Sequence, residues 1–179
     1  MRNPVGNGSA PVIRAAVFND IGFLNRDRDE IDYFDESFRQ SEDIECWCRI
    51  ALSTKWRFEG IAGQLTRYRI NEGGLSANVV RQFTTWLRVK EVVKQMNPGF
   101  ARRWAPVAEA YQLRYLARRC IRMGEGAMAW SLIKDALKAC PKIVRQEPGK
   151  TLTTLLAAGV LRFLPAPMNA PLQAMMMRR

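Results

Sequence analysis

Histidine is absent from this chain of 179 residues, and cysteine occurs only four times. Cys46 and Cys48 flank a tryptophan at a spacing that sends them to different sides of a helix, and Cys120 and Cys140 each stand alone. A zinc-type site needs cysteine or histidine ligands in regularly spaced pairs, which this sequence does not contain. We therefore expect no metal site and four reduced thiols, which is the usual state of cysteine in a cytosolic protein.

Long hydrophobic runs are also missing. The uncharged run at residues 151–161 has 11 residues, whereas a helix that spans a bilayer needs about 20. The next uncharged run, residues 163–177, is interrupted by three prolines. Residues 1–10 are polar and glycine-rich, unlike a signal peptide. The sequence thus predicts no transmembrane helix and a cytoplasmic protein, with at most a peripheral position at the inner face of the membrane.

Acidic residues are scarce in the second half of the chain. Residues 1–80 contain 10 Lys and Arg against 12 Asp and Glu, a net charge of −2, whereas residues 81–179 contain 18 against 5, a net charge of +13. Such a basic segment suits nucleic acid or an anionic membrane surface. Zinc-finger spacing, an aromatic RNP-type run and a compact basic arm are all absent, so we expect no nucleic-acid partner. The remaining interpretations are a peripheral membrane contact and a solvated helical face.

Carboxylates gather in one short segment, and its pattern predicts a helix over residues 42–52. Ser41 is a favourable N-cap, and Glu42, Asp43 and Glu45 suit the positive end of a helix dipole. One interpretation is that these acids only stabilise the start of a well-capped helix. Alternatively, a carboxylate at the start of a helix beside a cleft can act as a general base on a hydroxyl. The apolar residues expected on the buried face are Ile44, Trp47, Cys48 and Ala51.

Several short elements flank this helix. We expect a short strand at residues 11–13, followed by a helix that ends near Gly22. Residues 56–59 alternate apolar and charged side chains, which predicts a strand with one buried face. A second strand is predicted over residues 64–70, and it ends at the glycine-rich loop 71–74.

A series of short motifs runs from Gly6 to about Asn78: Gly6-Asn7-Gly8-Ser9, residues 12–18, Ile21-Gly22-Phe23, Phe34-Asp35-Glu36, Ser41-Glu42-Asp43, Trp56-Arg57-Phe58, Tyr68-Arg69 and Leu75-Ser76. Their order and register resemble the C-terminal half of the catalytic domain of family 2 glycosyltransferases, which are inverting enzymes that use nucleotide-sugar donors. The resemblance implies a partial GT-A-like α/β half with few strands. It also implies transfer of a sugar from a nucleotide-sugar donor to a hydroxyl acceptor, in bacterial glycan or polysaccharide synthesis.

The resemblance assigns roles to particular residues. The aspartate of the Glu-Asp pair is the catalytic base in this family, so that role falls on Asp43, with Glu42 beside it in the substrate site. Arg67, Arg69 and Ser76 become candidate contacts of the donor diphosphate. Arg69 is the best of them, because a guanidinium can pair bidentately with phosphate oxygens. The alternative is that the arginines lie on an exposed strand face.

The same resemblance implies a divalent cation, magnesium or manganese, in the complete enzyme. Its ligands are expected outside this chain, in a nucleotide-binding half of about 100 residues that would precede it. We therefore expect a truncated enzyme without turnover of its own. Asp27-Arg28-Asp29 looks like the metal-binding Asp-x-Asp motif, but it lies in a charged insert, residues 24–33, just before the expected base. Surface-loop charge is the preferred interpretation.

The remaining chain reads as helix. Helices are predicted over residues 80–96, 101–123, 127–140 and 152–164, and the second and third resemble one tetratricopeptide-type hairpin. The predicted organisation is thus an acceptor-side glycosyltransferase-like part, residues 1–79, and a basic all-α helical appendage, residues 80–179. The competing interpretation is a non-enzymatic basic helical adaptor that binds a protein partner or an anionic membrane surface.

Overall fold

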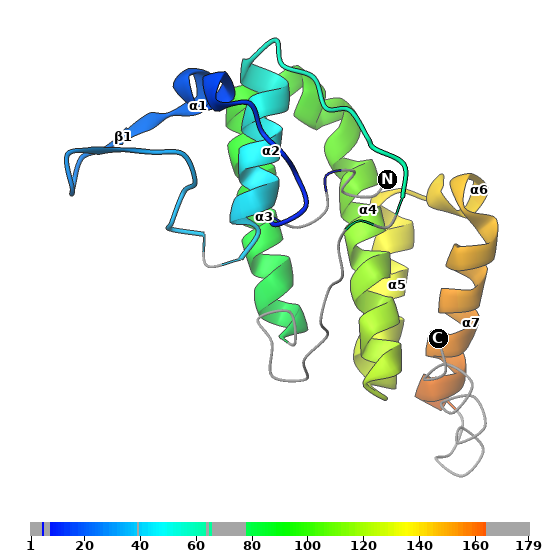
Figure 1. Ribbon diagram of the computed structural model, residues 1–179. Coiled ribbons are helices and arrows are strands. Elements are labelled where there is room, and N and C mark those ends of the chain that lie inside the picture. The colour runs from blue at the N-terminus through cyan, green and yellow to red at the C-terminus, as the bar shows by residue number, and fades with distance from the viewer. Residues whose placement is uncertain (1–4, 6–7, 39, 64, 66–77, 164–179) are drawn as a thin grey trace. The chain divides into compact units, whose positions relative to one another are not determined.

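The computed structural model describes residues 5, 8–38, 40–63, 65 and 78–163 (Figure 1). Over this part of the chain the protein is mostly helical, with seven helices and one two-stranded antiparallel hairpin. The chain forms two compact units, residues 2–102 and residues 103–179.

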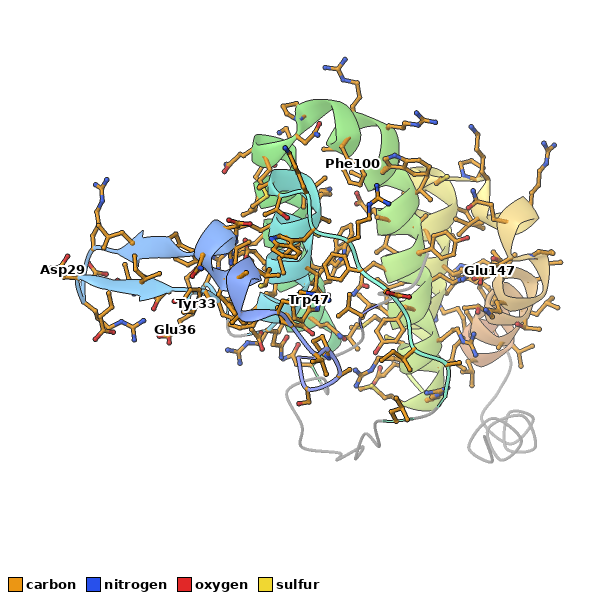
Figure 2. The ribbon with its side chains drawn as sticks, turned by 45° about the horizontal axis from the view of Figure 1, so that its top comes forward. Asp29, Tyr33, Glu36, Trp47, Phe100 and Glu147 are labelled. Carbon is orange, nitrogen blue, oxygen red and sulfur yellow. The ribbon has the colours of Figure 1, made fainter. Side chains whose placement is uncertain are left out.

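The first unit contains a hairpin and three complete helices. Strands β1 and β2 pair antiparallel, with Phe23 opposite Asp32 and Asn25 opposite Glu30. Asp29 lies in the turn at the tip of the hairpin (Figure 2), where it adopts a positive φ of 53° that aspartate tolerates. The elements in chain order are α1 (Ala15–Ile21), β1 (Phe23–Asn25), β2 (Glu30–Asp32), α2 (Glu42–Ser53), α3 (Val79–Met96) and the first turn of α4 (Pro98–Arg122).

Helix α2 lies beside α1 and α3, and it supplies most of the core of the first unit. Trp47, labelled in Figure 2, is the largest side chain of that core, and the edges of the Phe34 and Phe58 rings approach it at centroid distances of 6.2 and 6.4 Å. The buried members are Val17, Ile21, Cys46, Trp47 and Ile50, with Val5, Ile13, Phe18, Phe34 and Trp56 packed against them.

Arg49 connects α2 to α1 and to the hairpin. Its guanidinium pairs with the buried carboxylate of Glu45, with Nε 2.9 Å from Oε1 and Nη2 3.0 Å from Oε2. It also donates to the backbone carbonyl of Tyr33 at 2.8 Å and to that of Ile21, and it lies 4.9 Å from the centre of the Phe23 ring. Arg49 therefore binds the backbone carbonyl of the last residue of α1 and the backbone at the start of the segment that leads into α2.

The second unit is all helical. Its elements are the remainder of α4, then α5 (Gly126–Ala139), α6 (Ile143–Gln146) and α7 (Pro148–Phe163). Helices α5 and α7 lie side by side (Figure 1), and they run antiparallel, because Gly126 at the start of α5 contacts Leu161 near the end of α7. The buried side chains of α4 and α5 include Leu113, Leu116, Ala117, Cys120, Ala129, Ile133 and Ala136.

The helix predictions are confirmed to within a few residues, apart from α6, which the sequence did not suggest. The expected α/β half is not: the strands that the structure describes are those of the small hairpin, inside the segment expected to be a loop. Residues 11–13 and 56–59 are not strands. The predicted strand 64–70 lies outside the described residues except for Leu65, and the boundary expected at residue 79 stays a prediction.

Segment 56–59 has a local reason for not being a strand. The Trp56 backbone N–H donates to Thr54 Oγ1 at 3.1 Å, and its indole N–H donates to the Asp20 carboxylate at 2.7 Å. The alternating pattern reflects packing of Trp56 and Phe58 around the core, with Phe58 against Trp47. A strand needs a neighbouring strand to bind its backbone groups, and the fold supplies none here among the residues described.

Two details predicted for α2 are wrong. Ser41 lies at the N-cap position, but its φ of 66° is left-handed and its side chain makes no capping hydrogen bond. The buried face is also rotated: Cys46 and Ile50 are buried with Trp47, whereas Ala51 is exposed and Cys48 only half-buried. The ion pair between Glu45 and Arg49 explains the rotation, because it draws two charged residues of this helix inward.

Candidate functional site

Asp43 lies in the first turn of α2, where the sequence placed the candidate base. Its side chain is half-buried, while the adjacent Glu42 is exposed. Gly8 lies directly against it, since a Cβ built on Gly8 would be 4.0 Å from the Asp43 Cβ. The segment around Gly8 and the start of α2, 35 residues apart in the sequence, are therefore neighbours in the fold.

The environment of Asp43 changes its acidity. Burial raises the pKa of the carboxyl, a hydrogen bond from the Ile44 backbone N–H lowers it, and the charge of Glu42 raises it further, with a net pKa above the ordinary value for aspartate. The Ile44 nitrogen is 2.7 Å from Oδ1. A carboxylate with a raised pKa binds a proton more readily near neutral pH, which is the property that a general base requires.

The hydrogen bond to Ile44 is also what an aspartate that only stabilises a helix start would form. Asp43 is half-buried beside a backbone segment, and Glu42, which has the same relation to the helix dipole, is exposed. Burial of a charged carboxylate adds nothing to its interaction with the helix dipole. A role for Asp43 beyond the helix start stays a prediction.

Trp47 follows Asp43 by one helical turn, so the two side chains leave the same side of α2. The Trp47 indole is 6% exposed, and its N–H has no hydrogen-bond acceptor within the residues that the structure describes. A buried donor without an acceptor costs free energy, of the order of 1–3 kcal/mol.

The other residues assigned by resemblance cannot be compared with Asp43. Arg67, Arg69 and Ser76 lie outside the described residues, so their contacts with a donor diphosphate stay a prediction. The structure brings together Asp43, Glu42 and Gly8.

Two arginines that hold this region together were missed by the sequence reasoning. Arg49 could have been found, because Glu45 precedes it by four residues on the same helix. Arg88 of α3 gave no local signal. Its guanidinium donates to the Ser37 carbonyl at 2.9 Å and to the Ser37 hydroxyl at 3.1 Å, and lies 4.4 Å from the centre of the Phe38 ring. Arg88 thereby fixes the segment that leads into Asp43.

The cysteines of α2 are not suited to nucleophilic chemistry. Burial raises the pKa of both the Cys46 and the Cys48 thiols to about 11, so both are protonated at neutral pH. All four cysteines are free thiols.

A divalent-cation site is not formed by the part of the chain that the structure describes, where no group of three or more Cys, Asp or Glu side chains is placed to hold a metal. Asp27 and Asp29 lie in the exposed turn of the hairpin, as expected for a surface loop. Arg28 between them pairs with Asp32 at 2.9 Å and with Glu36 at 3.2 Å.

An open depression lies at the other end of α2 and is lined by Asp20, Ser53, Thr54, Lys55 and Trp56. Because an α-helix rises 1.5 Å per residue, Ser53 is about 15 Å along the helix from Asp43. The depression is therefore separate from the candidate base.

Comparison of the chain with family models, with curated proteins and with solved structures found no match. Among the residues described, no helix has both the length and the apolar character needed to cross a bilayer.

Proposed function

We propose that residues 1–79 are the acceptor side of an inverting glycosyltransferase of the family 2 type, with Asp43 as its general base. The observation that supports this most directly is the position of Asp43: a half-buried carboxylate of raised pKa at the start of α2, against Gly8. The order of motifs from Gly6 to Asn78 supports the same proposal.

In the proposed reaction, the acceptor hydroxyl oxygen attacks the anomeric carbon of the donor sugar. The bond between that carbon and the diphosphate oxygen breaks, the nucleotide diphosphate leaves, and the configuration at the carbon is inverted. The hydroxyl proton passes to the Asp43 carboxylate. Arg67, Arg69 and Ser76 are proposed to bind the diphosphate, since guanidinium groups pair well with phosphate oxygens.

The donor nucleotide needs a further structural element. Nucleotide sites of α/β proteins lie at the carboxyl ends of parallel strands, and within the part of the chain that the structure describes the strands form one antiparallel hairpin. We propose that a strand-rich nucleotide-binding half completes the enzyme and holds its divalent cation.

The experiment joins this chain to the nucleotide-binding half of a family 2 glycosyltransferase and measures sugar transfer. Asp43→Asn keeps the size of the side chain and an oxygen for the Ile44 N–H, but removes the base. We expect turnover to fall by about 10²-fold or more with little change in donor binding. Asp29→Asn, in the exposed hairpin turn, is the matched control and should leave turnover unchanged. Turnover of the Asp43→Asn protein within a few-fold of the parent would remove Asp43 from the base role.

A second measurement needs no added half. Carboxyl-detected NMR titration of residues 1–179 should give Asp43 a pKa above the ordinary range for aspartate, because burial disfavours its charged form. An ordinary or lowered value would mean that Asp43 is a solvated capping residue and would count against the proposal.

A further inference from the structure

Helix α7 has an apolar face that the described residues of the second unit leave largely exposed. Thr151, Thr154, Ala157 and Ala158 are buried on one side of it. Leu152, Leu156 and Phe163 are 47, 68 and 66% exposed. At 100° per residue these three side chains fall within a narrow stripe opposite the buried side, and the Phe163 ring also meets the Trp130 ring of α5 edge-on, with the ring centroids 5.4 Å apart. We call them the α7 stripe.

The charges on α7 itself are positive, and one exposed acid, Glu125, lies near its end, because it precedes Gly126, which contacts Leu161. Helix α7 contains Lys150 and Arg162 and no acidic residue. The nearest acid before it, Glu147, is paired with Arg114 and with Lys150. Arg162 is exposed, and its guanidinium lies 5.8 Å from the centre of the Phe163 ring. An exposed cation therefore lies against one end of the apolar stripe.

Helix α6 adds to this basic character. It packs against α7, and both Lys142, just before it, and Arg145 within it are exposed. Over residues 103–163 the chain has 11 Lys and Arg against 4 Asp and Glu. The surroundings of the stripe attract anionic groups and repel another basic surface.

Single exposed apolar residues need no explanation, but three in line on one helix face, bordered by cations, are the pattern of a helix that lies in a membrane interface. We propose that α7 binds the surface of an anionic phospholipid membrane, with the α7 stripe at the boundary of headgroups and acyl chains. Arg162 and Arg145 then face the lipid phosphates. This proposal does not depend on the transferase activity proposed above.

A second copy of the chain fits the stripe less well. A stable protein interface buries roughly 800 Å² on each partner. Three partly exposed side chains, with an aromatic ring contributing about 200 Å² at most, supply well under that area. Two copies would also bring two positively charged surfaces together, and these repel each other. An anionic lipid surface attracts the same charges.

The test is co-sedimentation of the full chain with vesicles at low and high salt. One set of vesicles contains phosphatidylcholine alone, and the other contains equal parts of phosphatidylcholine and phosphatidylglycerol. We expect binding to the anionic vesicles only, and loss of that binding at high salt. Binding that ignores lipid charge and salt, or no binding at all, would overturn the proposal.

Variants then locate the contact. The double variant Leu152→Gln, Leu156→Gln should bind anionic vesicles at least about tenfold more weakly, because it removes apolar side chains from the interface. Arg162→Gln should weaken binding by about fivefold, the contribution of one basic residue near an anionic surface. The control is Val80→Gln on α3 of the first unit, where Val80 is 62% exposed. Far-UV circular dichroism establishes that each variant is folded.

Two results would refute the assignment even if the chain binds vesicles. Equal binding of the folded double variant and the parent would show that α7 is not the contact. Sedimentation velocity without lipid provides the other: self-association of the parent that the double variant abolishes would identify a second copy as the occupant of the stripe.

Discussion

Gly126→Ala tests the packing of α5 against α7. Gly126 is buried at the first position of α5, and a Cβ built there would lie 2.5 Å from the Leu161 carbonyl oxygen, 2.6 Å from its carbonyl carbon and 2.9 Å from its Cβ. Two of these atoms belong to the backbone of α7, so no side-chain rotation relieves the contact. Carbon atoms approach other non-bonded atoms to about 3.5 Å, and the end of α7 must therefore move by roughly 1 Å.

The size of the effect follows from two opposing contributions. Overpacking of a well-packed interface costs about 1–3 kcal/mol. Replacing glycine with alanine in a helix contributes about 0.5–1 kcal/mol in the stabilising direction. We expect Gly126→Ala to lower the free energy of unfolding by about 1–2 kcal/mol. The matched control is Gly149→Ala in the first turn of α7, where a Cβ would meet nothing within 4 Å; it should be neutral or stabilising.

Hydrogen exchange is the suitable assay, because it reports on each helix separately. The chain has two compact units, and a single unfolding midpoint would combine the unfolding of both. Amides of α5 and α7 should exchange faster in Gly126→Ala and at an unchanged or slower rate in Gly149→Ala. In a thermal scan, each kcal/mol of lost stability lowers the transition temperature of a unit this small by about 4–8 °C. If both substitutions change stability in the same direction, the close approach of α5 and α7 is not real.

Two further predictions concern buried charge. Glu45→Gln leaves Arg49 without its carboxylate and should lower the free energy of unfolding in urea by about 3 kcal/mol. The control, Glu91→Gln, breaks an exposed pair and should cost less than about 1 kcal/mol. Equal losses would contradict the structural role of Arg49. Hydrogen bonds from Lys150 and from Arg114 lower the pKa of Glu147 to about 2, from an ordinary value of 4.5. The folded state thus favours the charged carboxylate, so its stabilising contribution is present above pH 4.5 and is lost as the pH falls toward 2. Glu147→Gln should flatten the dependence of the urea midpoint on pH in that window, and an unchanged pH dependence would exclude this role for Glu147.

At the first turn of α2, some properties of the candidate site could be predicted from the sequence and others could not. The position of Asp43 at the start of a helix could be predicted, because acids favour that end of a helix and the apolar spacing after it is helical. Its burial could not, because burial depends on the approach of Gly8, a contact between segments far apart in the chain. The pKa of Asp43 is therefore a property of the fold.

The predicted strand at residues 56–59 did not form for the same physical reason. Residues 56–59 carry a strand-like alternation, but a strand forms only where a partner strand is present, and here Trp56 instead binds Asp20 and Thr54. The hairpin at residues 23–32 formed in a segment without such alternation, and the hydrogen bonds from Asn25 and Arg28 to Asp32 stabilise it. In both segments, hydrogen bonds made by particular side chains determined the backbone conformation.

The sequence by itself determined the long helices, including α3, α5 and α7, because helical hydrogen bonds join residues four apart and the apolar spacing is local. It also determined the basic character of residues 81–179. Only the tertiary structure decided which face of α2 is buried, because Arg49 draws Glu45 inward through contacts with Ile21 and Tyr33. The exposure of the α7 stripe was also decided by tertiary packing, because α5 covers the opposite side of α7 and reaches the stripe at Phe163 through Trp130, while Leu152 and Leu156 stay exposed.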